Sequence, residues 1–483
     1  MHKIKDPFLI VILLLSLALG ASTLTRGHEW GDDWASYVMQ AQSILNGKMD
    51  EFIERNSFTI FESSVQIGPV AYPWGYPLTL TPVLLLRGVH PLTLKLPGLL
   101  FFAGFLIFFY LLTETRLTRT ERLLLVSLFA FNPALIKSLD YIISDIPFLF
   151  SVFLALWLME RADAQAGMKS QVLLGAGIFL SFFFRTTGIV LLAGYLAWQG
   201  WRFLTDRTRQ KEVVVNSATA VVTFALFWFL SSFFFPNGQG SYVRQLAGLT
   251  PEILRSNLVN YFYLFVQFFD PNTAAAWTYL YYLLVVFFFF GVWTRRHADQ
   301  IWIIFFAFYF MVMVLWPEWQ GLRFIFPLLP LFMYFAFQGV LAVMRKLPEK
   351  YFLMGRRLNF LLWGVLAGIF LFASAVHAYA NLANDRRING PFEAFSMEMY
   401  DYVRENIPAD SVIVFFKPRA LRLFTDRDAI MSIECDRLLL GDYVILHKNW
   451  EYSQILPGDI QNCRLPLKLM YENRKYLVYE LQK

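Results

Sequence analysis

Long, unbroken runs of apolar residues are the feature that most restricts how this chain folds. Runs of roughly 17–23 residues are long enough to cross a bilayer as an α-helix. Such runs occupy 8–24, 94–112, 123–139, 146–160, 172–184, 187–203, 213–235, 277–293, 301–316, 324–344 and 358–379, with ends uncertain by a few residues. We therefore expect about eleven transmembrane helices, whereas an outer-membrane β-barrel would need short segments of alternating polarity.

The overall composition supports the same class. Hydrophobic residues make up 57% of the chain and charged residues 16%, against about 45–50% and about 25% in soluble domains. The contents of Pro, Gly and Cys exclude disordered, collagen-like and disulfide-scaffold proteins. The sequence predicts a polytopic α-helical membrane protein, with the membrane domain over 1–379 and a separate domain over 380–483.

The basic residues set the expected orientation. If Lys3 and Lys5 are cytoplasmic, the loops after the second, fourth, sixth, eighth and tenth expected spans are cytoplasmic too. These loops hold most of the other basic residues, as the positive-inside rule requires. These are Arg116, Arg119, Arg122, Arg161, Lys169, Arg202, Arg207, Arg209, Lys211, Arg295, Arg296, Arg345, Lys346, Lys350, Arg356 and Arg357. The formal charge of +6 is thereby explained by topology, and no nucleic-acid partner is expected.

Three longer segments, 25–93, 236–276 and 380–483, lie on the opposite, extracytoplasmic side in this topology. Function is expected where they meet the membrane surface. One alternative stays open for the first apolar run. Lys3 and Lys5 precede an apolar core that ends in Leu19-Gly20-Ala21, which also fits a cleaved signal peptide.

The first extracytoplasmic segment contains two adjacent carboxylates. Asp32 and Asp33 precede residues at helical spacing with Gly47 as the stop, which predicts an amphipathic helix lying in the membrane interface, apolar face down. One Asp could simply cap that helix. Because a cap needs only one carboxylate, the second favours a functional role.

Further charged residues interrupt apolar sequence on the same face. Asp145 opens a predicted helix in Ser144-Asp145-Ile146-Pro147, where it is either a cap or a functional acid. Arg185 and Arg323 each stand at a predicted membrane boundary. Each either extends its charged head to the water or holds a phosphate, and for Arg323 we favour phosphate. Together these residues indicate transfer chemistry on a lipid-linked phosphate.

Several motifs in this order carry a family resemblance. They are Asp32-Asp33 before a helix with Tyr37, the stretch Tyr72-Pro73-Trp74-Gly75-Tyr76-Pro77, Ser144-Asp145-Ile146-Pro147, and Arg323-Phe324-Ile325-Phe326-Pro327-Leu328-Leu329-Pro330. In this combination the chain resembles membrane glycosyltransferases of the GT-C class. It is most similar to the branch that contains dolichyl-phosphate-mannose protein mannosyltransferases, lipid A aminoarabinose transferases and bacterial enzymes that add sugars to lipopolysaccharide.

The resemblance implies an inverting transfer of a sugar from a polyprenyl-phosphate donor to an extracytoplasmic glycan, lipid or protein acceptor, in a bacterial inner membrane. It implies Asp33 as the base, Asp32 and Asp145 as orienting or metal-binding partners, and Arg323, Arg185, Tyr72 and Tyr76 as contacts of the donor. Family members commonly have Asp-Glu in the first loop. Trp34 follows Asp33 here, so the choice between Asp32 and Asp33 as base and the retention of a divalent metal stay open.

The last 104 residues predict a small extracytoplasmic α/β domain. An amphipathic helix over 392–403 precedes strands at 412–416, 429–433 and 443–447 and a hairpin of 467–471 with 476–481. Lys417 and Arg419 are candidate contacts for an anionic lipid, the donor or the acceptor, and a solvated loop is the alternative. Cys435 and Cys463, the chain's only cysteines, can form a disulfide in an oxidising exterior.

Other chemistries have less support. The six histidines show no paired ligand spacing, although His28, beside Glu29, could join Asp32 at an ion. The sequence has no Gly-rich nucleotide loop. The competing hypotheses are a lipid or glycolipid transporter or flippase, which needs ionisable residues near the bilayer midplane, and a polysaccharide polymerase or ligase, which shares the lipid-linked donor.

Overall fold

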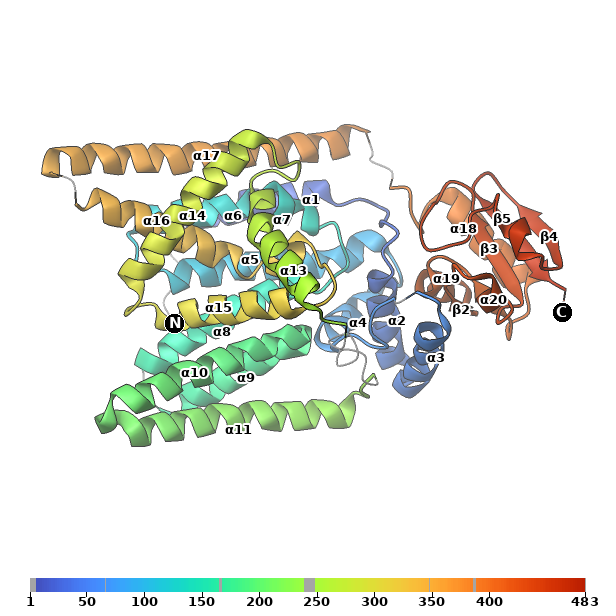
Figure 1. Cartoon of the computed structure of the whole chain (residues 1–483), viewed down its shortest axis with the longest axis horizontal. Helices are drawn as coiled ribbons and strands as arrows, with labels where there is room; N and C mark the ends of the chain where they lie inside the picture. Colours follow the sequence, from blue (N-terminus) through green and yellow to red (C-terminus); the bar gives the residue numbers. More distant parts are fainter. Residues whose placement is uncertain are drawn as a thin grey trace.

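A bundle of helices and a small α/β domain at one of its ends make up this protein (Figure 1). The computed structural model describes residues 6–65, 67–164, 167–238, 248–346, 348–384 and 388–482. The bundle contains α1 (Pro7–Thr23), α5 (Pro91–Leu112), α6 (Arg119–Ala130), α7 (Pro133–Ser138), α8 (Asp145–Ala164), α9 (Met168–Phe184), α10 (Ile189–Thr205), α11 (Gln210–Phe234), α13 (Pro251–Leu264), α14 (Ala275–Arg295), α15 (Gln300–Leu315), α16 (Leu329–Met344) and α17 (Glu349–Asn384).

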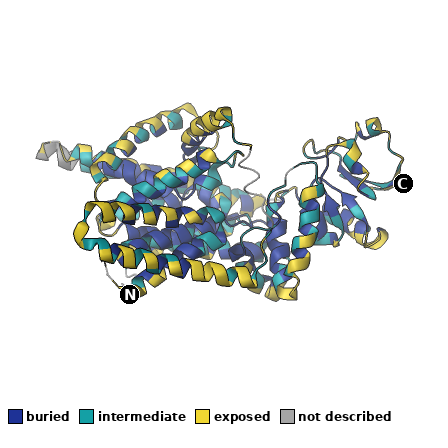
Figure 2. Ribbon diagram, turned by 60° about the horizontal axis from the view of Figure 1, so that its bottom comes forward, coloured by how far each residue is buried: buried dark blue, intermediate teal, exposed yellow. Residues whose placement is uncertain are grey.

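The outer faces of the bundle are apolar and exposed, the reverse of a soluble protein. Phe229 and Phe233 on α11 and Leu361 and Leu362 on α17 are exposed, and the peripheral helices carry exposed residues along their length in Figure 2. Helices α5, α11, α14 and α17 are long and apolar enough to cross a membrane, and α1, α9, α15 and α16 are shorter apolar helices. The chain is therefore an integral membrane protein, and the total of eleven spans stays a prediction.

The apolar run 123–139 is not one span as expected, because α6 ends at Ala130 and the short α7 begins at Pro133. The Asn132 side chain accepts hydrogen bonds from the backbone N–H groups of Ala134 and Leu135, which caps α7. Pro133, in the first turn of α7, has no N–H to continue α6. The expected span was read from hydrophobicity alone, which does not register a helix cap at Asn132 or a helix start at Pro133.

Three helices of the segment 25–93 lie between the bundle and the C-terminal domain: α2 (Asp33–Asn46), α3 (Met49–Glu62) and α4 (Gly75–Arg87). Helix α2 ends at Gly47, as predicted, with φ at +66°. The location of α2 in the membrane interface stays a prediction, but the face opposite its apolar residues is largely covered by other helices. Helix α2 packs against α4 on one side and α19 (Pro418–Thr425) of the C-terminal domain on another, so its polar residues Ser36 and Gln40 are buried.

The C-terminal domain has helices α18 (Ala394–Asn406), α19 and α20 (Cys435–Leu438) around a five-stranded sheet. Its strands are β1 (Val412–Val414), β2 (Asp428–Ile430), β3 (Tyr443–His447), β4 (Leu467–Glu472) and β5 (Tyr476–Leu481), in the spatial order β2-β1-β3-β5-β4. The β1 strand pairs parallel with β2 and β3, while β5 pairs antiparallel with β3 and β4. The predicted helix, strands and hairpin are all present, with small shifts at their ends.

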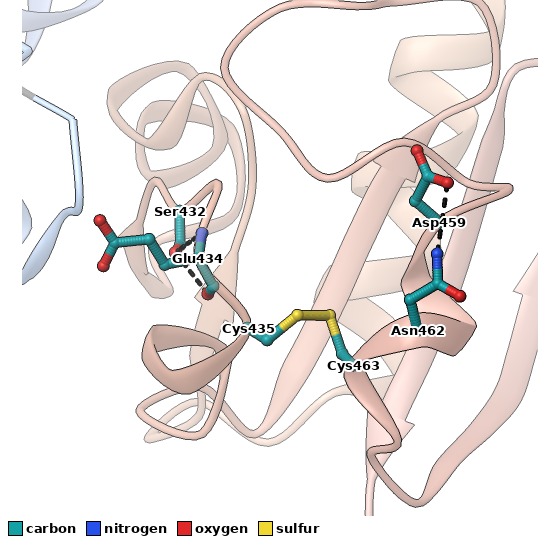
Figure 3. Close-up of a disulfide and its surroundings, with 6 residues drawn as sticks. All are labelled: Ser432, Glu434, Cys435, Asp459, Asn462 and Cys463. Carbon is teal, nitrogen blue, oxygen red and sulfur yellow. Dashed lines mark hydrogen bonds between the residues drawn. A yellow bond between two sulfur atoms is a disulfide. The ribbon is translucent and has the colours of Figure 1, made fainter.

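A disulfide joins Cys435 and Cys463, which are 28 residues apart (Figure 3). It links the start of α20 to the short 3₁₀-helix η5 (Ile460–Cys463). Both sulfurs pack beside a small apolar cluster that includes Val414, Ile430 and Leu446. The bond therefore ties the segment that follows β3 to the start of α20, beside this apolar cluster.

Candidate active site

A cavity of about 350 Å³ collects most of the charged residues that the sequence singled out. It lies where α2, the loop before α4, the start of α8, the segment after α9 and the segment after α15 meet. Its lining includes Asp33, Tyr37, Tyr72, Ser144, Asp145, Arg185, Glu318, Trp319 and Arg323. Residues that are up to 290 positions apart in the sequence thus share one space, with two carboxylates of the predicted set opposite two guanidinium groups.

Asp33, in the first turn of α2, presents its carboxylate to this cavity. One oxygen accepts a 2.6 Å hydrogen bond from the Tyr72 hydroxyl, and the other lies 3.4 Å from Nη2 of Arg323. Burial and the charge of Asp33 raise the pKa of Tyr72 well above its usual value, so the phenol remains a donor. The Asp33 side chain is 34% exposed, and a ligand in the cavity can therefore reach it.

Asp145 is the buried anchor for both arginines. Its side chain is 2% exposed and forms an ion pair with Arg185, while its second oxygen lies 3.9 Å from Nη1 of Arg323. The guanidinium of Arg185 also stacks over the ring of Phe324 at 4.1 Å. Asp145 therefore orients cations. The Arg323 side chain is 39% exposed, which leaves donors available to an anionic ligand.

Asp32 has different surroundings from its neighbour. It occupies the N-cap position of α2 without making a side-chain cap hydrogen bond, so the capping alternative is wrong. The side chain is 5% exposed, and Oδ2 lies 3.8 Å from Nε of Arg419. Burial raises the pKa of Asp32 above its usual value against the opposing charge of Arg419. Asp33, and not Asp32, is the accessible carboxylate.

Arg419 does not lie in a solvated loop, and that alternative is wrong. It is in the first turn of α19 and is fully buried, so direct contact with a lipid phosphate does not fit its position. Its guanidinium donates to the carbonyl oxygens of Ile67 and Pro69 and lies 5.6 Å from the ring centre of Tyr72. The C-terminal domain thus holds the loop that carries the hydrogen-bond partner of Asp33.

Tyr76 also has a supporting position and does not contact the cavity as the donor-binding prediction required. It is 1% exposed and packs edge-on against Tyr37 at 5.1 Å between ring centres. Tyr37 in turn stacks near Tyr72 at 4.6 Å and shares a 2.9 Å hydrogen bond with Ser144. Tyr76 therefore lies beneath Tyr37, which separates it from the cavity.

A second cavity of about 340 Å³ borders the first on the side of the C-terminal domain. Asp33 and Arg323 line both cavities. The half-buried Lys417 lines the second one, together with Asp32 and Ser453. Of the two predicted basic contacts in the C-terminal domain, Lys417 faces a cavity and Arg419 does not.

A groove of about 200 Å³ borders the first cavity on the other side and shares Tyr72, Pro73 and Thr186 with it. Aromatic side chains of α9 and α11 line the groove, and they include Phe182, Phe183, Trp228 and Phe235. Gly75 packs where a Cβ atom would lie 2.4 Å from the carbonyl oxygen of Phe183. This glycine allows the loop before α4 to approach α9 closely enough to close the groove.

Sequence reasoning missed the segment between α15 and Arg323. Trp316, Glu318, Trp319 and Gln320 all line the first cavity. The cluster of Trp, Pro, Glu and Gly that interrupts apolar sequence at 316–321 could have identified the segment as functional. It supplies a further carboxylate that no prediction included.

The residues present do not fit a metal site of protein ligands alone. Within the described ranges, no three His, Cys, Asp or Glu side chains come together as a ligand group, and Asp145 is engaged by Arg185. His28 does not face an ion with Asp32. Its Nε2 accepts a 3.1 Å hydrogen bond from the backbone N–H of Ile142, and Nδ1 lies 2.9 Å from the carbonyl oxygen of Glu29.

Comparison with known proteins gives structural relatives only. No family model matches the sequence, and no curated protein matches it. The ArnT of Cupriavidus metallidurans superposes with a TM-score of 0.60 at 12% identity, covering 97% of both chains. The same protein bound to undecaprenyl phosphate gives 0.59 at 11% identity and 98% of both chains.

An oligosaccharyltransferase of Archaeoglobus fulgidus also superposes, with a TM-score of 0.59 at 11% identity over 100% of this chain and 75% of the relative. At these identities the comparisons establish the fold and not the substrate. ArnT, a lipid A aminoarabinose transferase, and the oligosaccharyltransferase are members of the GT-C class. The chain therefore has the overall fold of these two proteins, and its sequence motifs resemble those of the GT-C class.

Proposed function

We propose that the protein is an inverting glycosyltransferase that moves a sugar from a polyprenyl-phosphate donor to an extracytoplasmic acceptor. The observation that carries this proposal is the accessible Asp33 carboxylate in one cavity with Arg185 and Arg323. A base and two cations within one cavity match the needs of this reaction, in which a hydroxyl loses a proton and a phosphate gains negative charge.

The reaction needs one bond formed and one broken. Asp33 takes the proton of the acceptor hydroxyl as its oxygen attacks the anomeric carbon, and the bond from that carbon to the phosphate oxygen breaks. The electron pair leaves with the polyprenyl phosphate, where Arg323 and Arg185 stabilise the new charge. Tyr72 and Asp145 keep the base and the cations in place. Asp33 is assigned as the base because it is partly exposed to the cavity, whereas Asp32 is buried.

The two neighbouring spaces suit the two substrates. The groove between α9 and α11 presents four aromatic side chains that suit a polyprenyl chain, beside the polar Ser231, Ser232 and Asn237, and it adjoins the cavity that holds the cations. Its role is supported by relatives that were solved with undecaprenyl phosphate and with a dolichol phosphate. The second cavity, which shares Asp33 and contains Lys417, is assigned to the acceptor. This acceptor is a glycan, lipid or protein on the outer face of a bacterial inner membrane, with the amino terminus cytoplasmic.

The test is transfer by the purified protein. We expect incubation with radiolabelled polyprenyl-phosphate sugars to release polyprenyl phosphate and to label an acceptor in added membrane extract. Asp33→Asn should lower this release by about 10²–10⁴-fold. Asp50→Asn, an exposed acid at the start of α3, is the matched control and should retain activity.

Two results would contradict the proposal. One is full release by Asp33→Asn at an unchanged protein level. The other is movement of the labelled lipid across sealed vesicles without any release of polyprenyl phosphate, which would identify a transporter.

A further inference from the structure

A third polar cavity, of about 330 Å³, lies at the far end of α2 between α3 and the C-terminal helix α19. Its lining includes Gln42, Ser43, Asn46, Phe52 and Arg422. At about 1.5 Å per helical residue, Ser43 is about 15 Å from Asp33 along α2. The cavity is therefore separate from the space in which the sugar would be transferred.

Arg422 is a buried cation without a paired carboxylate in the described part of the chain. It is 5% exposed, and its three hydrogen bonds, of 3.3–3.4 Å, go to Asn56, Thr59 and the sulfur of Met39. All three partners are neutral. Burial, reinforced by the charge of Arg55, lowers the pKa of Arg422 to about 9, which shows that its surroundings disfavour the charge.

The other charged residues of the cavity are already paired. Lys48 lies 3.0 Å from Glu51, and Arg55 lies 2.6 Å from Asp426 and 2.8 Å from Asp428. Arg422 is thus the cation for which an incoming anion would supply the missing counter-charge. A buried guanidinium without one is costly, and its planar donors match an oxyanion.

The rest of the lining is suited to a sugar. Gln42 and Ser43 offer an amide and a hydroxyl group, and Phe52, whose ring centre lies 5.6 Å from the Arg422 guanidinium, offers an apolar face. We propose that this cavity binds an anionic sugar residue, phosphorylated or carboxylated, of the acceptor. The assignment to the acceptor rests on the proposed glycosyltransferase function, whereas the binding site itself does not.

The test reads binding without transfer activity. Asn46 is exposed at the end of α2, and the two native cysteines form a disulfide, so Asn46→Cys places a single free thiol at the cavity. The rate at which a charged methanethiosulfonate reagent labels this thiol reports occupancy of the cavity. Glucose 6-phosphate, at constant ionic strength, should slow labelling by at least about fivefold when it occupies most of the sites. Glucose, which lacks the anion, should not.

Arg422→Gln in the Asn46→Cys protein should abolish this protection, and Arg422→Lys should keep part of it. Arg474→Gln, in the exposed turn between β4 and β5, is the matched control and should leave protection intact. If Arg422→Gln does not fold, the contrast between glucose 6-phosphate and glucose in the Asn46→Cys protein still decides the matter.

Three outcomes would overturn the proposal. The first is equal labelling with and without glucose 6-phosphate, and the second is protection that survives Arg422→Gln. The third is protection in phosphatidylglycerol nanodiscs, but not in phosphatidylcholine nanodiscs, before any sugar is added, because a lipid headgroup would then be the occupant. Loss of transferase activity in Asp33→Asn with intact protection would separate this site from the proposed function.

Discussion

Two clusters of Asp and Arg lie near opposite ends of α15, and they differ in how their charges are satisfied. Asp299, just before α15, is fully buried and accepts hydrogen bonds from Arg116 at 2.5 Å, Arg295 at 2.7 Å and Tyr334 at 2.7 Å. Asp33, in the cluster beyond the other end of the helix, has one short hydrogen bond, an arginine at 3.4 Å and a side chain that is 34% exposed.

The difference separates structural charge from charge that is available for chemistry. Burial opposes ionisation of Asp299, yet the hydrogen bonds and charges of Arg295 and Arg116 hold its pKa below the usual value. Such a network is complete and leaves nothing for a ligand to do. The cluster around Asp33 is incomplete and opens into a cavity, so its charged groups remain available to a ligand.

The strongest test of this contrast is to make the same Asp→Asn substitution at Asp299 and at Asp33 and to compare the effects on stability and on transfer. Asp299→Asn should destabilise the fold by about 3–5 kcal/mol, because Arg295 loses its buried carboxylate partner and Arg116 keeps only Glu160. It should retain near-normal transfer per folded molecule. Asp33→Asn should do the opposite, with normal thermal stability and strongly reduced transfer. Thermal unfolding in detergent and release of polyprenyl phosphate measure the two effects, and a stability loss in both variants would remove the distinction.

The transfer rate should also depend on the planar guanidinium shape of Arg323 in the cluster around Asp33. Arg323→Gln should lower the rate of transfer by about 10²-fold, the usual cost of one donor to a developing anion. Arg323→Lys should recover only part of that rate, because an ammonium cannot form the paired contacts of a guanidinium. Steady-state rates at saturating donor measure this effect. Arg295→Lys in the closed cluster is the control, and it should alter unfolding and leave the rate per folded molecule unchanged.

The sequence allowed much of this to be predicted, because both membrane helices and strands have strong local patterns. The five strands, the end of α2 at Gly47 and the residues at the open cluster all follow from periodicity, turn residues and charges in apolar surroundings. The roles of Arg419 and Tyr76 could not be predicted, because they depend on α19 packing over α2 and on Tyr37 covering its neighbour. These are contacts between distant segments, and no local pattern encodes them.

A double-mutant cycle should show that Asp145 and Arg185 act as one unit. Their ion pair is the most buried contact of the open cluster, so Asp145→Asn and Arg185→Gln should be non-additive in transfer rate, with a coupling of about 1–3 kcal/mol. Asp145→Asn with Asp299→Asn, which lie in different clusters, should be additive within about 0.5 kcal/mol. Additive behaviour of Asp145 and Arg185 would mean that Asp145 does not hold the cation.

The two ends of α15 should also differ in their stability at acid pH. Burial lowers the pKa of His28 to about 3, and the hydrogen bond from the Ile142 N–H requires an unprotonated Nε2. A folded-state pKa below the unfolded value of about 6.5 means that this contribution to stability is complete above pH 6.5. It declines by about 1.4 kcal/mol per pH unit as the pH falls from 6.5 towards 3. The lowered pKa of Asp299 makes its cluster lose stability only below about pH 4.

Hydrogen exchange, corrected for intrinsic rates, should therefore show weaker protection at pH 5 than at pH 7 around Ile142 and unchanged protection around Asp299. Replacing His28 with Gln should remove the pH dependence near Ile142 whatever it does to overall stability. The pKa of His447 in the C-terminal domain is also lowered by burial, to about 4, so His447→Gln is the control and should leave the response near Ile142 intact. An equal loss of protection around Ile142 and around Asp299 at pH 5 would contradict this prediction. Protonation would then destabilise the whole fold and not the region around Ile142 alone.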